Sequence, residues 1–422
     1  MAVHLTDQRW DALFFSTVLL ATSCYCMQEI PSLHDYLKDF FGKQQPAQFE
    51  FYYNISQSIS HGVLISYTII TGILADLYKP AIVLIVQAFL ICIAQFTIYI
   101  AVYSQLLWLL FVGRILLYTQ ASALFISAKV FVSNCSSEKY KGLSIGILVS
   151  SGVVIFGVNL IVDPFLTSNY GLDISTFTTF LIASIGFICS LVCYHYEQAV
   201  EYEIKIQDDS GPDSEDPTNS VQEIVTEEKL SQWEQIKNFS SHYWVCCVIL
   251  FLSINLSTIM EITAPAFLTS IWQMNPLQVT QMFSMVPLMC LAVPYFAYLI
   301  DKYKIHYEWI ILCSLIQLVG VVFLAYIAPV SGTLIFGLGL SMRVAVLGPI
   351  LIKIVPSYSF GKAFAIVSFL KDLSGLVVFS IISVIIKKYN SYHYVIIIIL
   401  FINSLIFILS IPFYRQGKLR IV

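Results

Sequence analysis

Charged residues are scarce in this chain of 422 residues. Asp, Glu, Lys and Arg together make up 11% of it, whereas soluble domains carry about 25%. The mean hydropathy of +0.80 points the same way. A chain this apolar could not cover itself with polar surface in water, so the composition excludes a soluble globular domain.

The signatures of enzymes and metal sites are also absent. The sequence has no Walker pattern for ATP, no spaced His/Cys cluster for a metal and no nucleophile elbow. The ten cysteines lie mostly within apolar runs, where cysteine behaves as a small hydrophobic residue rather than as part of a disulfide framework. We therefore expect neither an enzyme nor an ATP-driven pump, and no metal or organic cofactor.

Long apolar runs fill most of the chain. Runs of about 20 residues predict membrane-spanning helices. The fifth span is the weakest, because Gly142, Gly146, Gly152 and Gly157 dilute it; small residues at such spacing favour a close helix–helix contact in lipid. The sequence thus predicts twelve spans, near residues 11–30, 51–76, 80–102, 106–131, 142–163, 174–195, 240–270, 277–300, 307–327, 331–355, 361–386 and 392–413.

The basic residues predict the orientation. With an even number of spans, both termini lie on one side of the membrane. The other side receives four of the 22 Lys and Arg residues, three lie inside spans, and the remaining fifteen lie on the side of the termini. By the positive-inside rule, the termini are cytosolic.

Two stretches far apart in the chain end an apolar run in the same way. Residues 72–76 (Gly-Ile-Leu-Ala-Asp) are followed by Lys79, and residues 297–301 (Ala-Tyr-Leu-Ile-Asp) by Lys302. They are roughly half the chain apart, which suggests a duplicated six-helix bundle, the build of many secondary transporters. The fold class expected is therefore an all-α integral membrane protein with two six-helix halves.

The two halves are expected at residues 1–196 and 239–422. The segment between them, 197–238, is acidic and rich in Pro and Ser, as in Asp208-Asp209-Ser210-Gly211-Pro212. Such a composition cannot bury a core and predicts a solvated cytosolic linker. A regulatory or partner-binding role for this linker is the alternative.

Several motifs resemble a known family. They are Gly72-x-Leu74-Ala75-Asp76, Gly113-Arg114 and Asp301-Lys302, and, for one branch, residues 26–31, Leu107-Trp108-Leu109, Gly339-Leu340-Ser341, Gly348-Pro349, Val355-Pro356 and Gly361-x-Ala363-Phe364. The first three resemble the major facilitator superfamily. The others are similar to its lysosomal dipeptide transporter branch. The resemblance implies the major facilitator fold and transport of a dipeptide or amino acid out of an acidic organelle by alternating access.

The chain departs from that branch where its charged ligands are expected. Residues 118–122 (Tyr-Thr-Gln-Ala-Ser) contain no acid, and residues 150–154 (Ser-Ser-Gly-Val-Val) contain no arginine. The eleventh span instead carries Lys371-Asp372, where the branch has a neutral pair. Dipeptide specificity therefore cannot be transferred residue by residue. An organic anion or sugar carrier, or a non-transporting scaffold or receptor, stays open as an alternative.

Ionisable side chains inside spans are costly and mark candidate functional positions. Asp76 and Asp301, with Lys79 and Lys302, are expected to form the cytosolic gate, which holds helix ends of the two halves together. A Glu261–Arg343 ion pair is expected between the seventh and tenth spans. Adjacent Lys371 and Asp372 point about 100° apart on a helix, so one is expected to face the cavity and the other a neighbouring helix. The candidates for substrate binding or coupling are Glu29, His61, Arg114, Glu261, Arg343, Lys371 and Asp372.

Each of these candidates has an ordinary structural explanation as well. Glu261 and Arg343 could be a packing ion pair, Arg114 a packing residue, and His61 a hydrogen-bonded histidine instead of a proton relay. The expected partners are a small-molecule solute, protons and the lipid bilayer, but not nucleic acid. The resemblance adds a homodimer or a single-span glycoprotein subunit. It also favours a lysosomal or similar acidic membrane, with the plasma membrane as the alternative.

Overall fold

The backbone of a chain in lipid must satisfy its own hydrogen bonds, and helices do so within one segment. The computed structural model describes residues 9–41, 46–137, 140–209, 236–237, 239–274, 276–355, 359–373 and 393–421, and all regular structure within them is helical. This confirms the all-α class. In that part of the chain, ten helices are long and apolar enough to cross a membrane.

Seven helices form the described part of the amino-terminal half. They are α1 (Trp10–Ser32), α2 (His34–Phe41), α3 (Pro46–Leu77), α4 (Pro80–Tyr103), α5 (Leu107–Cys135), α6 (Lys141–Tyr170) and α7 (Leu172–Asp209). All but the short α2 correspond in order to predicted spans. Pro80 opens α4 at a position where the missing N–H is not needed, and Gly171, at φ +99°, ends α6.

The carboxy-terminal half is built in the same order. Its elements are α10 (Ser241–Ile271), α11 (Pro276–Leu288), η1 (Met289–Ala292), α12 (Val293–Tyr303), α13 (His306–Tyr326), α14 (Pro329–Ile354), the helical residues 360–373, and α16 (His393–Ile421). The predicted eighth span is divided into α11, η1 and α12, because Pro287 and Pro294 each remove a helical hydrogen bond.

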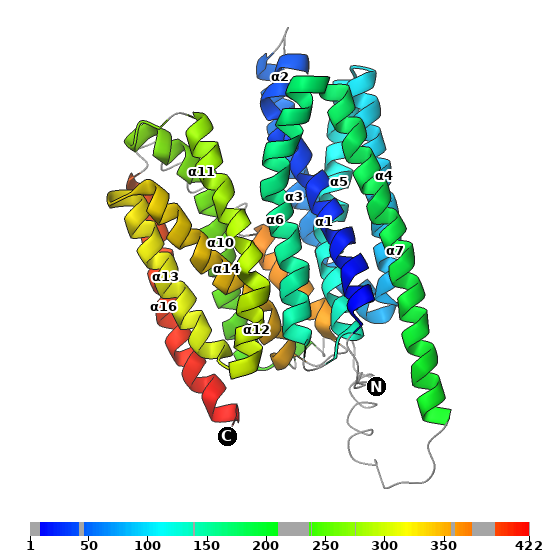
Figure 1. Ribbon diagram of the computed structural model, residues 1–422, viewed down its shortest axis with the longest axis vertical. Coiled ribbons are helices and arrows are strands. Elements are labelled where there is room, and N and C mark those ends of the chain that lie inside the picture. The colour runs from blue at the N-terminus through cyan, green and yellow to red at the C-terminus, as the bar shows by residue number, and fades with distance from the viewer. Residues whose placement is uncertain are drawn as a thin grey trace.

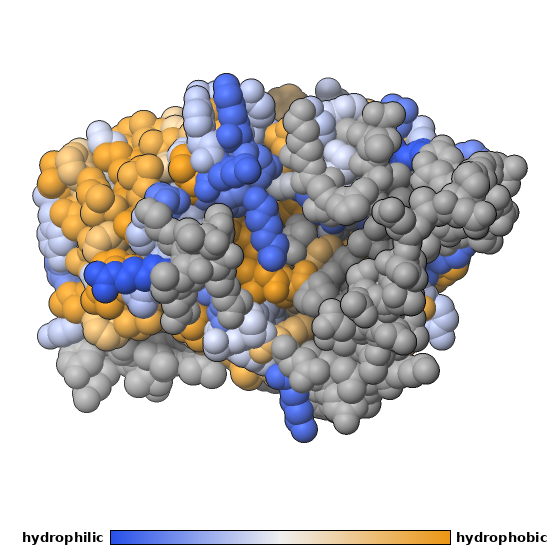
Figure 2. Space-filling model, turned by 90° about the horizontal axis from the view of Figure 1, so that it is seen from below, coloured by the Kyte–Doolittle hydropathy of each residue, from blue (hydrophilic) through white to orange (hydrophobic). Residues whose placement is uncertain are grey.

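Figure 1 shows the two halves as bundles side by side, with both termini at the same end. Helix α6 joins them, because it packs against α11, α12 and α14 of the other half. Seen from the end of the termini, hydrophilic residues are gathered on the end face and hydrophobic residues show at its flank (Figure 2). This arrangement agrees with the predicted placement of both termini on one side.

The first part of the predicted linker is helical. Helix α7 continues to Asp209, so it includes residues 197–209. Glu and Lys residues in this stretch are good helix formers, and a helix can extend beyond the membrane into water. Residues 210–235 lie outside the described part of the chain.

The glycines of α6 confirm the predicted close helix contact. A Cβ placed on Gly146 would lie 2.9 Å from Ala297 Cβ of α12, and one on Gly157 would lie 3.1 Å from Pro287 of α11. Gly152 instead faces Cys24 of α1. The glycines that dilute the hydropathy of this span are therefore what lets the two halves approach each other.

Candidate functional site

Asp76 joins the two halves at the end that carries the termini. It lies in the last turn of α3, and its carboxylate accepts hydrogen bonds from the backbone N–H groups of Gly361 (2.7 Å) and Lys362 (3.0 Å). The Lys362 ammonium lies 3.1 Å away, and both side chains are only 3% exposed. The carboxylate thus caps the start of a helix in the opposite half, where anions are favoured.

Two glycines allow this contact. A Cβ on Gly72 would overlap Ala365 and the carbonyl oxygen of Gly361, and a Cβ on Gly361 would meet the Asp76 carboxylate at 2.6 Å. Helix α3 and residues 360–373 therefore touch backbone to backbone. The two halves are therefore closed against each other at this end, and the gate role of Asp76 stays a prediction.

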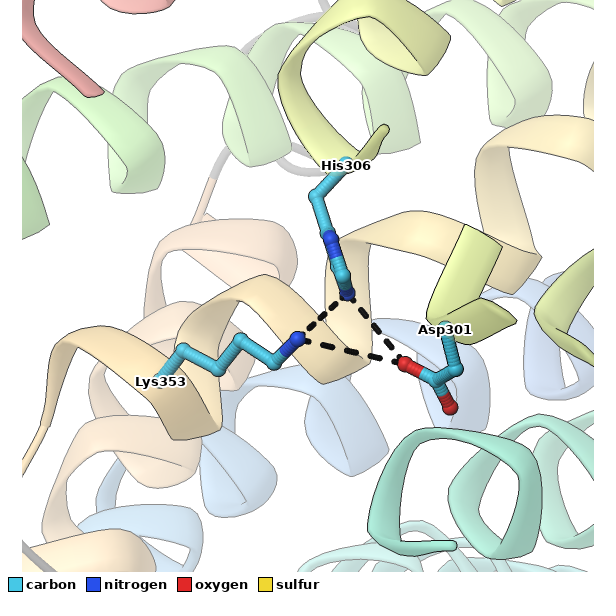
Figure 3. Close-up of polar contacts among 3 residues, drawn as sticks. All are labelled: Asp301, His306 and Lys353. Carbon is cyan, nitrogen blue, oxygen red and sulfur yellow. Dashed lines mark hydrogen bonds and ion pairs between the residues drawn. The ribbon is translucent and has the colours of Figure 1, made fainter. Parts of the chain in front are cut away.

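Asp301 occupies the matching position in the other half but makes different contacts. Its Oδ1 lies 3.2 Å from Nε2 of His306 and 3.9 Å from the Lys353 ammonium, and that ammonium lies 2.6 Å from the same His306 nitrogen (Figure 3). We call these three residues the Asp301 cluster. Across the interface, a Cβ on Gly142 would lie 2.5 Å from Asp301 Oδ2, so the carboxylate rests against the first turn of α6.

The two lysines predicted for the gate are not placed against these carboxylates. Lys302 lies over the rings of Tyr298 and Tyr303, at 5.7 and 5.5 Å, and Lys79 precedes α4 as its amino-terminal cap residue. The carboxylates contact Lys362, Lys353 and His306 instead, which the sequence argument missed. A usable signal was present, because Gly361-Lys362 and Lys141-Gly142 open corresponding helices of the two halves.

Lys371 lies between the halves. Its side chain is 43% exposed, and its ammonium interacts electrostatically with Cys24 of α1, His61 of α3 and Lys129 of α5. The neighbouring Asp372 is 1% exposed, with its Oδ1 3.8 Å from the Lys371 ammonium. The two side chains thus differ in exposure, and which of them faces a substrate cavity stays a prediction.

Helices α3 and α5 carry several polar contacts between their side chains. The His61 ring meets the Tyr118 ring edge to face at 5.2 Å, and the Tyr67 hydroxyl donates to Gln120 at 2.9 Å. Lys129 lies over the ring of Phe364 from the other half, at 5.1 Å. The predicted proton relay at His61 therefore stays a hypothesis, on a residue that does border the interface.

Arg343 lies inside the carboxy-terminal half. Its Nη1 donates to the backbone oxygen of Ser253 on α10 at 2.9 Å, the side chain is 3% exposed, and Cys313 of α13 lies beside it. Within the described residues its Nε and Nη2 have no acceptor. The predicted partner Glu261 belongs to α10, but its side chain is outside the described part; it is eight residues beyond Ser253, about 12 Å along the helix.

Arg114 joins two helices of the amino-terminal half. Its Nη1 donates to the backbone oxygen of Tyr53 and to Oγ of Ser56, both at 3.0 Å, and the guanidinium lies 3.9 Å from the Tyr53 ring centroid. These contacts connect α5 to α3 without a carboxylate. They agree with the packing explanation of Arg114, while a role in coupling stays a prediction.

Glu29 and Asp163 form a buried acidic network with neutral partners. Asp163 accepts hydrogen bonds from the Tyr25 hydroxyl at 2.6 Å and from the Asn159 amide at 2.7 Å. Glu29, near the end of α1, accepts from the Gln95 amide of α4, and both carboxyl groups are at most 1% exposed. No Lys or Arg pairs with either carboxyl group among the described residues. The sequence argument found Glu29 but not this network, because Asn159 and Gln95 are ordinary polar residues in their own spans.

Comparisons with known proteins agree on one family. The model described as Major Facilitator Superfamily matches residues 53–375. No curated protein matches the chain. Among solved structures, the proton:xylose symporter XylE bound to 6-bromo-6-deoxy-D-glucose is similar at a TM-score of 0.72 and 11% identity, covering 96% of this chain and 95% of the other.

Two further structures are comparably similar. A structure of the E. coli fucose:proton symporter FucP matches at a TM-score of 0.69 and 13% identity, over 96% of this chain and 99% of the other. The human organic anion transporter MFSD10 (TETRAN) matches at a TM-score of 0.71 and 10% identity, over 95% and 99%. At these identities the likeness is one of fold.

Proposed function

Because the chain belongs to the major facilitator superfamily, we propose that it moves a small solute bearing a carboxylate across the membrane by alternating access. The observation that carries this proposal is the position of Lys371. Its side chain is partly exposed and lies where both halves meet, the place where secondary transporters bind substrate. A free carboxylate is the natural partner of such a cation.

An amino acid or dipeptide is the first candidate solute. The resemblance to the dipeptide branch supports it, and so does the presence of charges of both signs near the interface. Lys371 would receive the carboxylate, while an acidic group receives the ammonium end. Asp372, which adjoins Lys371, is the acid that we propose for this second contact.

An organic anion is the second candidate, and one observation favours it. Among the described residues of the amino-terminal half, Lys129 and His61 lie close enough to Lys371 to interact with it electrostatically. A solute with negative charge alone would meet two ammonium groups there. This anionic class keeps Lys371 as the binding residue, so the two candidates share one site.

Uptake into proteoliposomes tests the proposal and separates the candidates. A panel of amino acids, dipeptides, organic acids and hexoses should give accumulation or exchange with a carboxylate-bearing class and not with hexoses. Uptake of hexoses alone would remove the carboxylate from the proposal. If no solute exchanges at neutral or acidic pH, the protein is a non-transporting scaffold or receptor.

The compartment follows from the same resemblance. We propose a lysosomal or similar acidic organelle membrane, from which the solute would leave with the proton gradient. Imaging of a tagged protein against organelle and plasma-membrane markers tests this placement, and labelling confined to the plasma membrane would refute it.

Glu29 is the residue that we propose as the proton carrier. A carboxyl group buried in a span with no cation beside it can bind and release a proton as the site opens to either side. Replacing it with glutamine should abolish accumulation driven by a proton gradient, while exchange of labelled for unlabelled solute continues. The matched control is Gln95→Glu/Glu29→Gln, which restores a carboxyl group to the same pair.

Two results would count against this assignment. Gradient-driven accumulation by the Glu29→Gln variant at the wild-type level would exclude Glu29 as the carrier. Loss of both accumulation and exchange would instead identify it as a binding or folding residue, which thermal unfolding of the purified variant then distinguishes.

A further inference from the structure

The Asp301 cluster joins three helices of the carboxy-terminal half at the closed end of the molecule. Asp301 comes from the last turn of α12, His306 is the first residue of α13, and Lys353 lies in the last turn of α14. The His306 side chain is nearly buried, whereas that of Lys353 is 55% exposed. Lys353 can therefore leave the cluster for water, and His306 cannot.

One nitrogen of His306 lies within reach of two partners that require opposite roles from it. Its Nε2 is 2.6 Å from the Lys353 ammonium, which can only donate a hydrogen bond, and 3.2 Å from Asp301 Oδ1, which can only accept one. A neutral His306 with an unprotonated Nε2 accepts from Lys353. The Lys353 ammonium then donates a hydrogen bond to His306 and forms an ion pair with the Asp301 carboxylate at 3.9 Å.

Protonation of His306 would rearrange these contacts. An imidazolium donates through Nε2, and Asp301 Oδ1 is already within reach at 3.2 Å. Two cations cannot stay 2.6 Å apart, so the exposed Lys353 side chain would swing away. Asp301 would lose its ion pair with Lys353 and gain a charge-assisted hydrogen bond from the protonated His306.

The cluster also touches the opposite half. Asp301 Oδ2 is buried against Gly142 in the first turn of α6 and has no hydrogen-bond donor within the described residues. The amino end of a helix carries partial positive charge, which attracts a carboxylate. This attraction across the interface holds only while the negative charge of Asp301 is not neutralised by a closer partner.

We propose that the Asp301 cluster is a cytosolic proton sensor, in which protonation of His306 releases Lys353 and weakens the closed gate between α12 and α6. The positive charge added at His306 sits near the positive end of α6. Charged residues close to the cluster along its own helices are Lys302 and Glu308, and on the facing helix α6 the Lys141 ammonium lies over the Phe360 ring. Acid on the cytosolic side therefore favours opening to the cytosol.

A distance measurement tests the sensor without any substrate. Fluorescent amino acids at Tyr78 on the α3–α4 turn and Arg415 on α16, two exposed positions, report the separation of the halves at the cytosolic end. Between about pH 8 and pH 5.5, where imidazoles titrate, the open-to-closed ratio should rise about two- to fivefold. His306→Gln, whose amide oxygen can still accept from Lys353, should stay closed throughout.

Two further variants keep the test decisive. His195→Gln changes an exposed histidine at the cytosolic end of α7 and should leave the pH response intact. If His306→Gln fails to fold, Lys353→Gln replaces it; without the competing ammonium, the opening should begin at higher pH. An unchanged response in His306→Gln, or no response in the wild type, would overturn the sensor.

The inference rests on alternating access, but the two can fail separately. A pH-dependent distance without uptake of any solute would refute the proposed transport and keep the sensor. Uptake by a protein whose gate ignores pH would refute the sensor alone.

Discussion

Replacing Asp76 with alanine should open the end of the protein that carries both termini. The carboxylate accepts hydrogen bonds from Gly361 and Lys362, and it neutralises an ammonium group that is 3% exposed. Removing one partner of a buried ion pair costs about 3–5 kcal/mol. The cost falls only on the closed state, because opening separates α3 from residues 360–373 and hydrates Lys362. The open-to-closed ratio should therefore rise about 100-fold or more.

The same probes at Tyr78 and Arg415 measure this shift. Asp76→Ala/Lys362→Met should return much of the closed population, since no unpaired charge remains. Asp35→Ala serves as the control, because that carboxylate is 94% exposed on α2 and far from the interface. If Asp76→Ala keeps the wild-type distance, the Asp76–Lys362 contact does not hold the gate.

Replacing Lys371 with glutamine should strongly weaken transport of the carboxylate-bearing solute. The Lys371 side chain is 43% exposed, and a hydrogen bond to a charged group contributes about 1.5–3 kcal/mol, which is about 10-fold or more in apparent affinity. Lys371→Arg keeps the charge and should retain part of the uptake. Initial rates in proteoliposomes over a range of solute concentrations measure the effect, with Lys304→Gln, an exposed lysine after α12, as the control.

Folding must be separated from binding in this experiment. Without Lys371, the buried Asp372 loses its nearest cation, so stability can fall as well. Lys371→Gln/Asp372→Asn removes that unpaired charge and should recover thermal stability without recovering uptake. Wild-type uptake by Lys371→Gln would exclude this residue from the binding site and, with it, the basis of the proposed function.

The architecture could be predicted well from the sequence, because the backbone of a segment in lipid must satisfy its own hydrogen bonds. A run of about 20 apolar residues must be helical to satisfy its own hydrogen bonds. The positions of Asp76 and Asp301 at matching helix ends, and the close contacts of the α6 glycines, could also be predicted from local patterns. The division of the eighth span at η1 was not predicted, although Pro287 and Pro294 indicate an interruption of the helix there.

Partners of the charged residues could not be predicted in the same way. Asp76 meets Lys362 across 286 positions of sequence, and Lys302, expected at the gate beside Asp301, faces tyrosine rings instead. A helix that is apolar on every side has no amphipathic pattern from which its contact face, and so its neighbouring helix, could be predicted. Arg343 donates to the backbone oxygen of Ser253, a contact that the sequence did not indicate, and its expected pairing with Glu261 stays a prediction.

The sequence alone thus determined the membrane setting, the helical class, the doubled six-helix plan and the set of costly charges. Only the tertiary structure decided how those charges are used. It broke the symmetry of the repeat, so that Asp76 binds across the interface while Asp301 contacts His306 and Lys353 within its own half. The physical reason is that helix formation is local, whereas ion pairing depends on the rotation and tilt of helices far apart in the chain.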